Sequence, residues 1–211
     1  MNSSTNDEPY LSVVIPAFNE ADRIEQTLDA VGEYLAHKGY PHEIIVVNDG
    51  STDATAVIVK GAEHRWPHLR LLGFDRNQGK GAAVRAGMLR AHGDVRLFMD
   101  ADNSTSIEQV DALLPFIERG YDVVIGSRKI AGAEIRVPQN LTREVLGSVY
   151  RAMAHALVPL PYRDTQNGFK LFSRVAARAL FSNLYTSGWS FDVEILARAE
   201  GGGFQVREVP V

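Results

Sequence analysis

The 211-residue chain is long enough for one α/β domain with a sizeable core and too short for two comfortable ones. Its formal net charge of −4 argues against a nucleic-acid partner, and the absence of cysteine excludes disulfides, thiol nucleophiles and cysteine-bound zinc. Residues 1–8 are predicted to form a disordered tail, and residues 9–211 a single domain with no secretory signal and no membrane-spanning run.

Short apolar runs alternate with amphipathic stretches along the chain. The runs predicted to be strands buried on both faces are Leu11–Ala17, Glu43–Val47, Val95–Met99 and Asp122–Ile125. The stretches predicted to be helices are the one with Ile24, Leu28, Val31 and Leu35 at helical spacing, then Ala54–Glu63 and Ala82–Ala91. This alternation predicts an α/β sandwich with right-handed crossovers.

Each predicted strand runs into a polar cluster. The clusters are Pro16–Glu20, Asn48–Asp53, Asp100–Ser104 and Gly126–Lys129. Because such sheets bind ligands beyond the carboxyl ends of their strands, we expect the clusters to converge on one functional edge.

Asp100, Ala101 and Asp102 directly follow the third predicted strand. Residues i and i+2 of an extended chain point to the same side, so the two carboxylates suit a hard cation such as Mg²⁺ or Mn²⁺ that also binds a diphosphate. The alternative is a solvated acidic turn in which Asn103 or Ser104 caps the next helix. The position after a buried strand favours the metal site.

Glu20 follows the first predicted strand, and Asp49 follows the second. Thr52 or Asp53 is expected to cap the next helix, which leaves Asp49 free to accept hydrogen bonds from a base or a ribose. The structural alternative for Glu20 is favourable charge at the start of a helix.

The loop Asn77–Gly81 precedes a predicted helix and resembles a phosphate cradle, with Lys80 as its charge. It lacks the P-loop spacing, so ATP hydrolysis is not expected, and a simple helix-entry turn explains its glycines almost as well.

The second half of the chain is less regular. Four cations lie near polar loops, and each is expected to be a surface charge unless it binds an acceptor phosphate: Arg128, Lys129, Arg163 and Lys170. Leu141–Val158 is an amphipathic helical stretch that either packs on its own domain or lies on a membrane surface. The chain ends at Val209–Val211 in an apparent strand edge.

Four motifs occur in the order seen in family 2 of the inverting glycosyltransferases with the GT-A fold: SVVIPAFNE, IIVVNDGSTDAT, NQGKGAAVRAGMLRAHGDVRLFMDADNST and VVIGSR. The resemblance runs from Leu11 to about Val211 and implies a Rossmann-like nucleotide-diphospho-sugar transferase sandwich with a mostly parallel central sheet. DTQNGFKLFSR (Asp164–Arg174) and SGWSFDVEIL (Ser187–Leu196) look most like the polyprenyl-phosphate and dolichyl-phosphate β-glucosyltransferases, and next like the dolichyl-phosphate mannose synthases.

Carried over position by position, the resemblance implies a site for a nucleotide sugar. The residues around the nucleoside would be Pro16, Phe18, Glu20 and Asp49. The residues by the nucleotide and its metal-bound diphosphate would be Lys80, Asp100, Ala101 and Asp102. Arg128 would face the phosphates, Asp164 and Gln166 would lie at the sugar and acceptor end, and Asp192 would be a catalytic carboxylate.

The resemblance also implies an activity: Mg²⁺- or Mn²⁺-dependent, inverting transfer of one hexose, from UDP-glucose, to a polyprenyl phosphate. A phosphate acceptor is already ionised near neutral pH, so Asp192 would be a base only for a hydroxyl acceptor. The alternatives are GDP-mannose as donor, a small soluble acceptor, or a sugar nucleotidyltransferase. We expect a cytoplasmic protein that reaches a lipid acceptor by peripheral docking through Leu141–Val158. No residue pattern indicates an oligomeric state.

Overall fold

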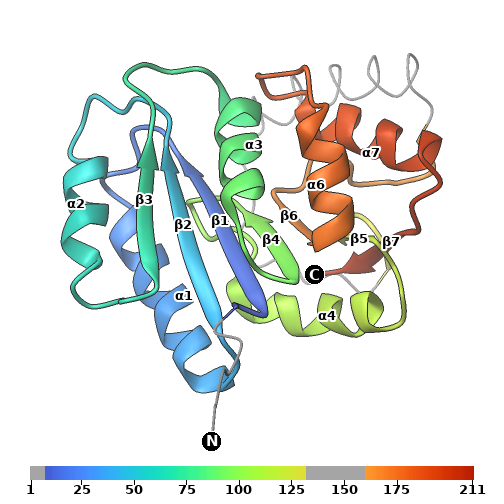
Figure 1. Ribbon diagram of the computed structural model, residues 1–211, viewed down its shortest axis with the longest axis horizontal. Helices are drawn as coiled ribbons and strands as arrows, with labels where there is room; N and C mark the ends of the chain where they lie inside the picture. Colours follow the sequence, from blue (N-terminus) through green and yellow to red (C-terminus); the bar gives the residue numbers. More distant parts are fainter. Residues whose placement is uncertain (1–7, 132–159) are drawn as a thin grey trace, which may run out of the picture.

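The computed structural model describes residues 8–131 and 160–211, and a seven-stranded sheet in the order β3-β2-β1-β4-β6-β5-β7 forms its centre (Figure 1). The strands are β1 (Leu11–Ala17), β2 (His42–Asn48), β3 (Leu69–Gly73), β4 (Val95–Met99), β5 (Val123–Ser127), β6 (Phe169–Ser173) and β7 (Val206–Pro210). All pairs in this sheet are parallel except those that β6 makes with β4 and β5. The predicted α/β class and mostly parallel sheet are confirmed.

The strands that were predicted are those with the most continuous burial. β1 and β4 have the predicted bounds, and every residue in them is buried. β2 and β5 differ from the prediction by one or two residues at their ends. The predicted strand edge at the end of the chain is β7, which pairs with β5 at the border of the sheet.

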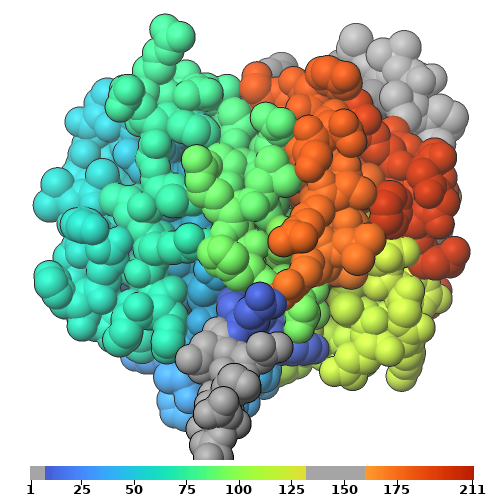
Figure 2. All heavy atoms as spheres, viewed as in Figure 1, coloured from blue at the N-terminus to red at the C-terminus, as the bar shows by residue number. Residues whose placement is uncertain are grey.

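Helices cover both faces of the sheet and bury two apolar clusters against it. On one face pack α1 (Ile24–Lys38), α2 (Thr55–Ala62) and α4 (Val110–Glu118). On the other pack α3 (Lys80–Arg90), α6 (Arg174–Ser182) and α7 (Phe191–Gly201). In the space-filling view α3, in green, and α6, in orange, meet along the visible face (Figure 2). The side chain of Arg85 on α3 ties the two helices by donating to the Phe181 carbonyl at 2.9 Å.

The amphipathic stretch Leu141–Val158 lies outside the described residues, so neither of its two predicted roles is tested. Across residues 8–131 and 160–211, no helix combines the length and the apolar character that crossing a bilayer requires.

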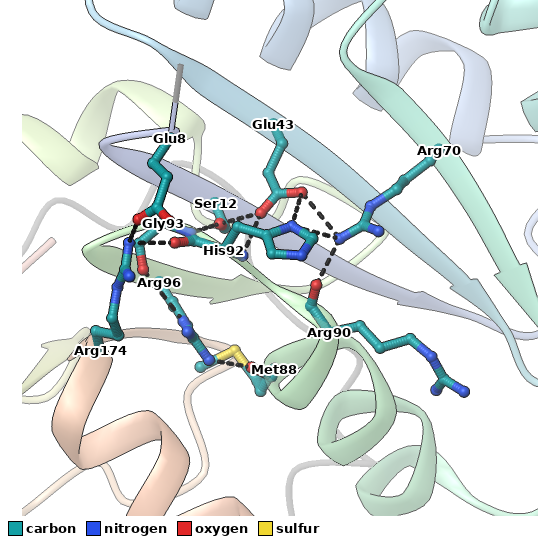
Figure 3. A network of polar contacts seen from close by, with 10 residues as sticks. All are labelled: Glu8, Ser12, Glu43, Arg70, Met88, Arg90, His92, Gly93, Arg96 and Arg174. Atoms are coloured by element: carbon teal, nitrogen blue, oxygen red, sulfur yellow. Dashed lines mark hydrogen bonds and ion pairs between the residues drawn. The ribbon is translucent and has the colours of Figure 1, made fainter. Parts of the chain in front are cut away.

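A polar network closes the edge of the sheet where β1 and β2 begin and α3 ends (Figure 3). Glu43 accepts hydrogen bonds from the Ser12 hydroxyl and the His92 N–H, both at 2.6 Å. Burial raises the pKa of Glu43, but these hydrogen bonds and the nearby charges of Arg70 and His92 together lower it below the usual glutamate value. The fully buried Arg96 donates to the carbonyl of Met88 at 2.6 Å, which satisfies an acceptor in the last turn of α3. The network therefore fixes the C-terminal end of α3.

Candidate functional site

The loops after β1, β2 and β4 are joined at the carboxyl edge of the sheet, as the sequence predicts. The Glu20 N–H, after β1, donates to the hydroxyl of Thr55 at the start of α2 at 2.8 Å. Asp49, after β2, binds the loop before α3, and Lys80 at the start of α3 pairs with Asp100 after β4. These contacts bring three of the four predicted polar clusters together.

Asp49 is buried, with 3% of its surface exposed. Its Oδ1 accepts the Gln78 N–H at 2.7 Å, and its Oδ2 accepts the Gly79 N–H at 2.9 Å. The prediction that Asp49 has no structural partner is therefore wrong, because its carboxylate fixes the loop before α3. Each carboxylate oxygen has a second lone pair, so a contact from Asp49 to a base stays a prediction.

The loop Asn77–Gly81 is built as a helix-entry turn. Gly79 has a φ of 101°, and a Cβ there would lie 2.5 Å from the Ser187 carbonyl oxygen. The Ala82 N–H donates to that carbonyl at 3.1 Å. Because two further amides of the loop bind Asp49, three of the N–H groups that a phosphate cradle would use have protein partners. Of the two readings, the geometry favours the helix-entry turn.

Asp100, Ala101 and Asp102 leave β4 on a turn that is held from two sides. The Asp100 N–H donates to the Gly168 carbonyl at 3.0 Å. The Ala101 carbonyl accepts the Thr27 hydroxyl of α1 at 2.7 Å. Asp102 is exposed, so the turn presents one carboxylate to solvent and one, Asp100, that is half-buried.

The alternative of a helix-capping turn at this position is wrong. The next helical segment, η1 (Ile107–Gln109), has Ser106 as its N-cap residue. Asp102 Oδ1 instead accepts the Ser104 N–H at 3.0 Å, and Asn103 has a positive φ of 50°. The Asp102 carboxylate therefore shapes the turn itself.

Glu20 adds a third carboxylate to this edge. Burial raises its pKa, Arg23 opposes that shift, and the negative charges of Asp102 and Asp100 raise the pKa further, so the net direction is upward. The Glu20 carbonyl also accepts the Ile24 N–H at 2.9 Å, at the start of α1. Glu20 thus has its predicted structural place at a helix start and also lies within the field of the two aspartates.

Lys80 supplies a cation in the middle of the edge. Its Nζ lies 2.7 Å from Asp100 Oδ1, 5.4 Å from the centre of the Phe98 ring and 4.8 Å from that of Trp189. The contact with the ammonium group shows that the Asp100 carboxylate can bind a cation. Within the described ranges no three acidic or histidine side chains form a ready metal cluster, so a divalent ion at Asp100 and Asp102 would need further oxygens from a ligand such as a diphosphate.

Asp192 is 2% exposed, and its Oδ1 lies 2.6 Å from Nζ of Lys170, which is 1% exposed. Burial raises the pKa of Asp192, against the opposing charges of Lys170 and Lys80. The expectation that Lys170 is a surface charge is wrong, because β6 lies between β4 and β5 inside the sheet. In this structure the Asp192 carboxylate is bound to Lys170, and its role as a base for a hydroxyl acceptor stays a prediction.

Asp164, 4% exposed, fixes the loop after β5. Its Oδ2 accepts the Arg128 N–H at 3.0 Å, and its Oδ1 pairs with Lys129 Nζ at 2.7 Å. The Asp164 N–H donates to Glu208 of β7 at 2.8 Å. Lys129 is therefore ion-paired rather than a free surface charge. That Arg128 faces phosphates, and that Asp164 and the half-buried Gln166 bind the sugar and acceptor end, stay predictions.

Pro16 and Phe18 differ in what they expose. Pro16 is buried in β1, opposite Val47 of β2. Phe18 follows the strand with 44% of its surface exposed. Phe18 therefore has a side chain that a ligand can reach, whereas Pro16 is enclosed in the strand, and a contact of either residue with a nucleoside stays a prediction.

Two residues that the sequence reasoning did not single out support the site. A Cβ on Gly168 would lie 1.9 Å from Asp100 Oδ2, so only glycine leaves room for this carboxylate. Trp189 is 74% exposed on the loop before α7 and covers the Lys80 ammonium group. The signal in the sequence was a glycine directly before an apolar run, and a tryptophan flanked by glycine and serine.

Comparison with known proteins places these residues in context. The model for glycosyl transferase family 2 matches residues 12–181. A dolichyl-phosphate beta-glucosyltransferase of Trichomonas vaginalis is 40% identical over 97% of this chain and 64% of its own length. The enzyme of that name from Saccharomyces cerevisiae is 35% identical over 100% of this chain and 69% of its own length. The one from Homo sapiens is 32% identical over 95% of this chain and 66% of its own length. The chain spans about two thirds of the length of these relatives.

Solved structures share the fold. Glucosyl-3-phosphoglycerate synthase of Mycobacterium tuberculosis, in complex with Mn²⁺, UDP-glucose and phosphoglyceric acid, has a TM-score of 0.70 at 22% identity, over 95% of this chain and 69% of that one. A mannosyltransferase of Pyrobaculum calidifontis, in complex with GDP-mannose and Mn²⁺, has a TM-score of 0.61 at 20% identity, over 96% of this chain and 55% of that one. The predicted GT-A architecture is confirmed.

Proposed function

Because the chain belongs to glycosyltransferase family 2, we propose that it transfers one glucosyl residue from UDP-glucose to a polyprenyl phosphate. The observation that carries the proposal is the meeting of Asp100, Asp102, Glu20 and Lys80 at the carboxyl edge of the sheet. The glucosyl group and the lipid phosphate are supported by relatives, 32% to 40% identical, that are named dolichyl-phosphate beta-glucosyltransferases.

Asp100 and Asp102 would hold Mg²⁺ or Mn²⁺ together with the donor diphosphate. A bound divalent ion supplies charge stabilisation to the departing diphosphate. Lys80, 2.7 Å from Asp100, adds a positive charge beside the same leaving group. Both effects act where negative charge develops, which is how electrostatic catalysis lowers a barrier.

The acceptor phosphate oxygen would attack the anomeric carbon opposite the departing diphosphate, which inverts the configuration at that carbon. The phosphate needs no base, because it is ionised near neutral pH. This agrees with the burial of Asp192 and its bond to Lys170. Arg128, in the loop that Asp164 fixes, is the residue that we place near a phosphate of donor or acceptor.

Family membership removes the sugar nucleotidyltransferase alternative. GDP-mannose as donor and a small soluble acceptor remain alternatives to test. A ligand that binds only the folded state raises the melting temperature, so UDP and GDP compared in the presence of Mn²⁺ distinguish the donors.

The direct test incubates the protein with radiolabelled UDP-glucose, Mg²⁺ or Mn²⁺ and a short polyprenyl phosphate, and counts label in the organic phase. We expect label that needs the lipid and disappears in Asp102→Ala. Label that is equal in Asp102→Ala, or absent while GDP-mannose gives product, would contradict the proposal.

A further inference from the structure

The ion pair of Lys80 and Asp100 occupies the place that the metal needs. The two side chains are only 14% and 29% exposed, so solvent screens the pair less than one on the open surface. Asp100 Oδ1 bonds to the ammonium group, while Oδ2 lies 1.9 Å from where a Cβ on Gly168 would stand. Without nucleotide, both oxygens of this carboxylate therefore have a close neighbour in the chain.

The ammonium group of Lys80 is held rather than merely solvated. Its Nζ lies within cation–π distance of the rings of both Trp189 and Phe98. The backbone of Lys80 is fixed on both sides, by the bond from Gly79 to Asp49 and by the bond from Ala82 to the Ser187 carbonyl. Only the flexible side chain of Lys80 is free to change its partner.

A divalent ion and an ammonium group repel each other when both lie at Asp100, because both are positive. A diphosphate changes this balance, since its oxygens attract the lysine ammonium group and also bind the metal. Asp102 is exposed and Asp100 is bound to Lys80, so one proposed metal ligand is accessible before the other.

We propose that Lys80 is an internal counter-ion that makes metal binding depend on the nucleotide. Its ammonium group neutralises Asp100 until the diphosphate of the donor attracts it, and Asp100 then binds the divalent ion. The metal accordingly binds weakly before the nucleotide and tightly with it. This inference rests on the proposed function, since it needs a nucleoside diphosphate at this edge and a metal at Asp100.

The test is calorimetric titration of Mg²⁺ into the wild type, Lys80→Met and Lys38→Met, each with and without UDP. Lys38 is also paired with an aspartate, Asp111, at 2.6 Å, so Lys38→Met controls for the change in net charge. We expect Lys80→Met to bind Mg²⁺ without UDP about tenfold more tightly than the wild type, which corresponds to about 1.4 kcal/mol. UDP should then strengthen Mg²⁺ binding less in Lys80→Met than in the wild type or Lys38→Met.

Unchanged Mg²⁺ affinity of Lys80→Met, in a protein that still binds UDP with Mg²⁺, overturns the counter-ion role and leaves the proposed function standing. A wild type that binds neither UDP nor GDP overturns both. These outcomes do not depend on turnover, so loss of activity in the variant does not obscure them.

Fluorescence gives a second measurement. The chain has two tryptophans, so Trp66→Phe leaves Trp189 as the single tryptophan. The centre of the Trp189 ring lies 4.8 Å from Lys80 Nζ. We expect Mg²⁺ alone to leave its emission unchanged, and UDP with Mg²⁺ to change it as the ammonium group departs. A full change on Mg²⁺ alone would overturn the proposed order of binding.

Discussion

Gly168→Ala tests whether the position of the Asp100 carboxylate decides activity. The added Cβ would lie 1.9 Å from Asp100 Oδ2 and 2.2 Å from Asp100 Cγ, whereas real Cβ atoms essentially never come within 3.0 Å of another group. The carboxylate must therefore shift by about 1 Å or more, and a displacement of that size in a site can cost about 100-fold in rate. We expect kcat for glucosyl transfer from UDP-glucose to fall by about that factor, with weaker Mg²⁺ binding in the presence of UDP.

Gly61→Ala is the matched control, because a Cβ at Gly61 in α2 meets nothing within 4 Å. Alanine is the better helix former by about 1 kcal/mol, so this variant should be slightly more stable and equally active. Far-ultraviolet circular dichroism establishes that Gly168→Ala is folded. If folded Gly168→Ala retains wild-type kcat and Mg²⁺ affinity, the contact with Gly168 does not position a metal ligand and the reasoning is wrong.

Three further predictions concern carboxylates that are bound by other groups of the protein. Asp49→Asn loses one of the two oxygens that accept amides of the loop before α3, and we expect UDP, measured by calorimetry, to bind about tenfold more weakly. Asp192→Asn leaves Lys170 buried without its counter-charge, so urea unfolding should show a loss of about 3–5 kcal/mol, much of which Asp192→Asn with Lys170→Met restores. Burial raises the pKa of Glu194, but hydrogen bonds from Thr186, Tyr185 and Arg198 outweigh it and lower the pKa to about 2. The ionised Glu194 therefore stabilises the fold fully above its unfolded pKa of 4.5, and this stabilisation is lost as the pH falls towards 2. The difference in unfolding free energy between the wild type and Glu194→Gln should vanish over that pH range. A difference that is independent of pH would contradict the assignment.

Local patterns in the sequence predicted β1 and β4 because those strands are apolar runs that the fold buries on both sides. The sequence did not indicate β3, whose residues are mostly half-buried at the edge of the sheet. It also did not indicate β6, because this buried strand contains the charged residue Lys170. A lysine in a central strand is stable because Asp192 neutralises it, and that partner lies in another element. No local pattern contains such a pairing.

The same limit applies to the site. Asp100 and Asp102 follow a buried strand, and position alone identified them as candidates. The use of Asp49 to bind the loop before α3 is a contact between segments distant in the sequence, as is the contact of Gly168 with Asp100. Sequence reasoning therefore found the carboxylates and missed the groups that orient them.

The reversed direction of β6 explains how the second half of the chain reaches the site. Since β6 is antiparallel to β4, Met99 at the end of β4 lies opposite Phe169 at the start of β6. A parallel β6 of the same five residues would start at the opposite end of the strands, about 13 Å away at about 3.3 Å per residue. The antiparallel pairing instead puts Gly168 against Asp100 and, through the same segment, Asp164 against the loop after β5. One reversed strand thus allows Gly168 to support Asp100, a carboxylate that the first half of the chain supplies, and Gly168→Ala should affect metal binding before it affects the fold.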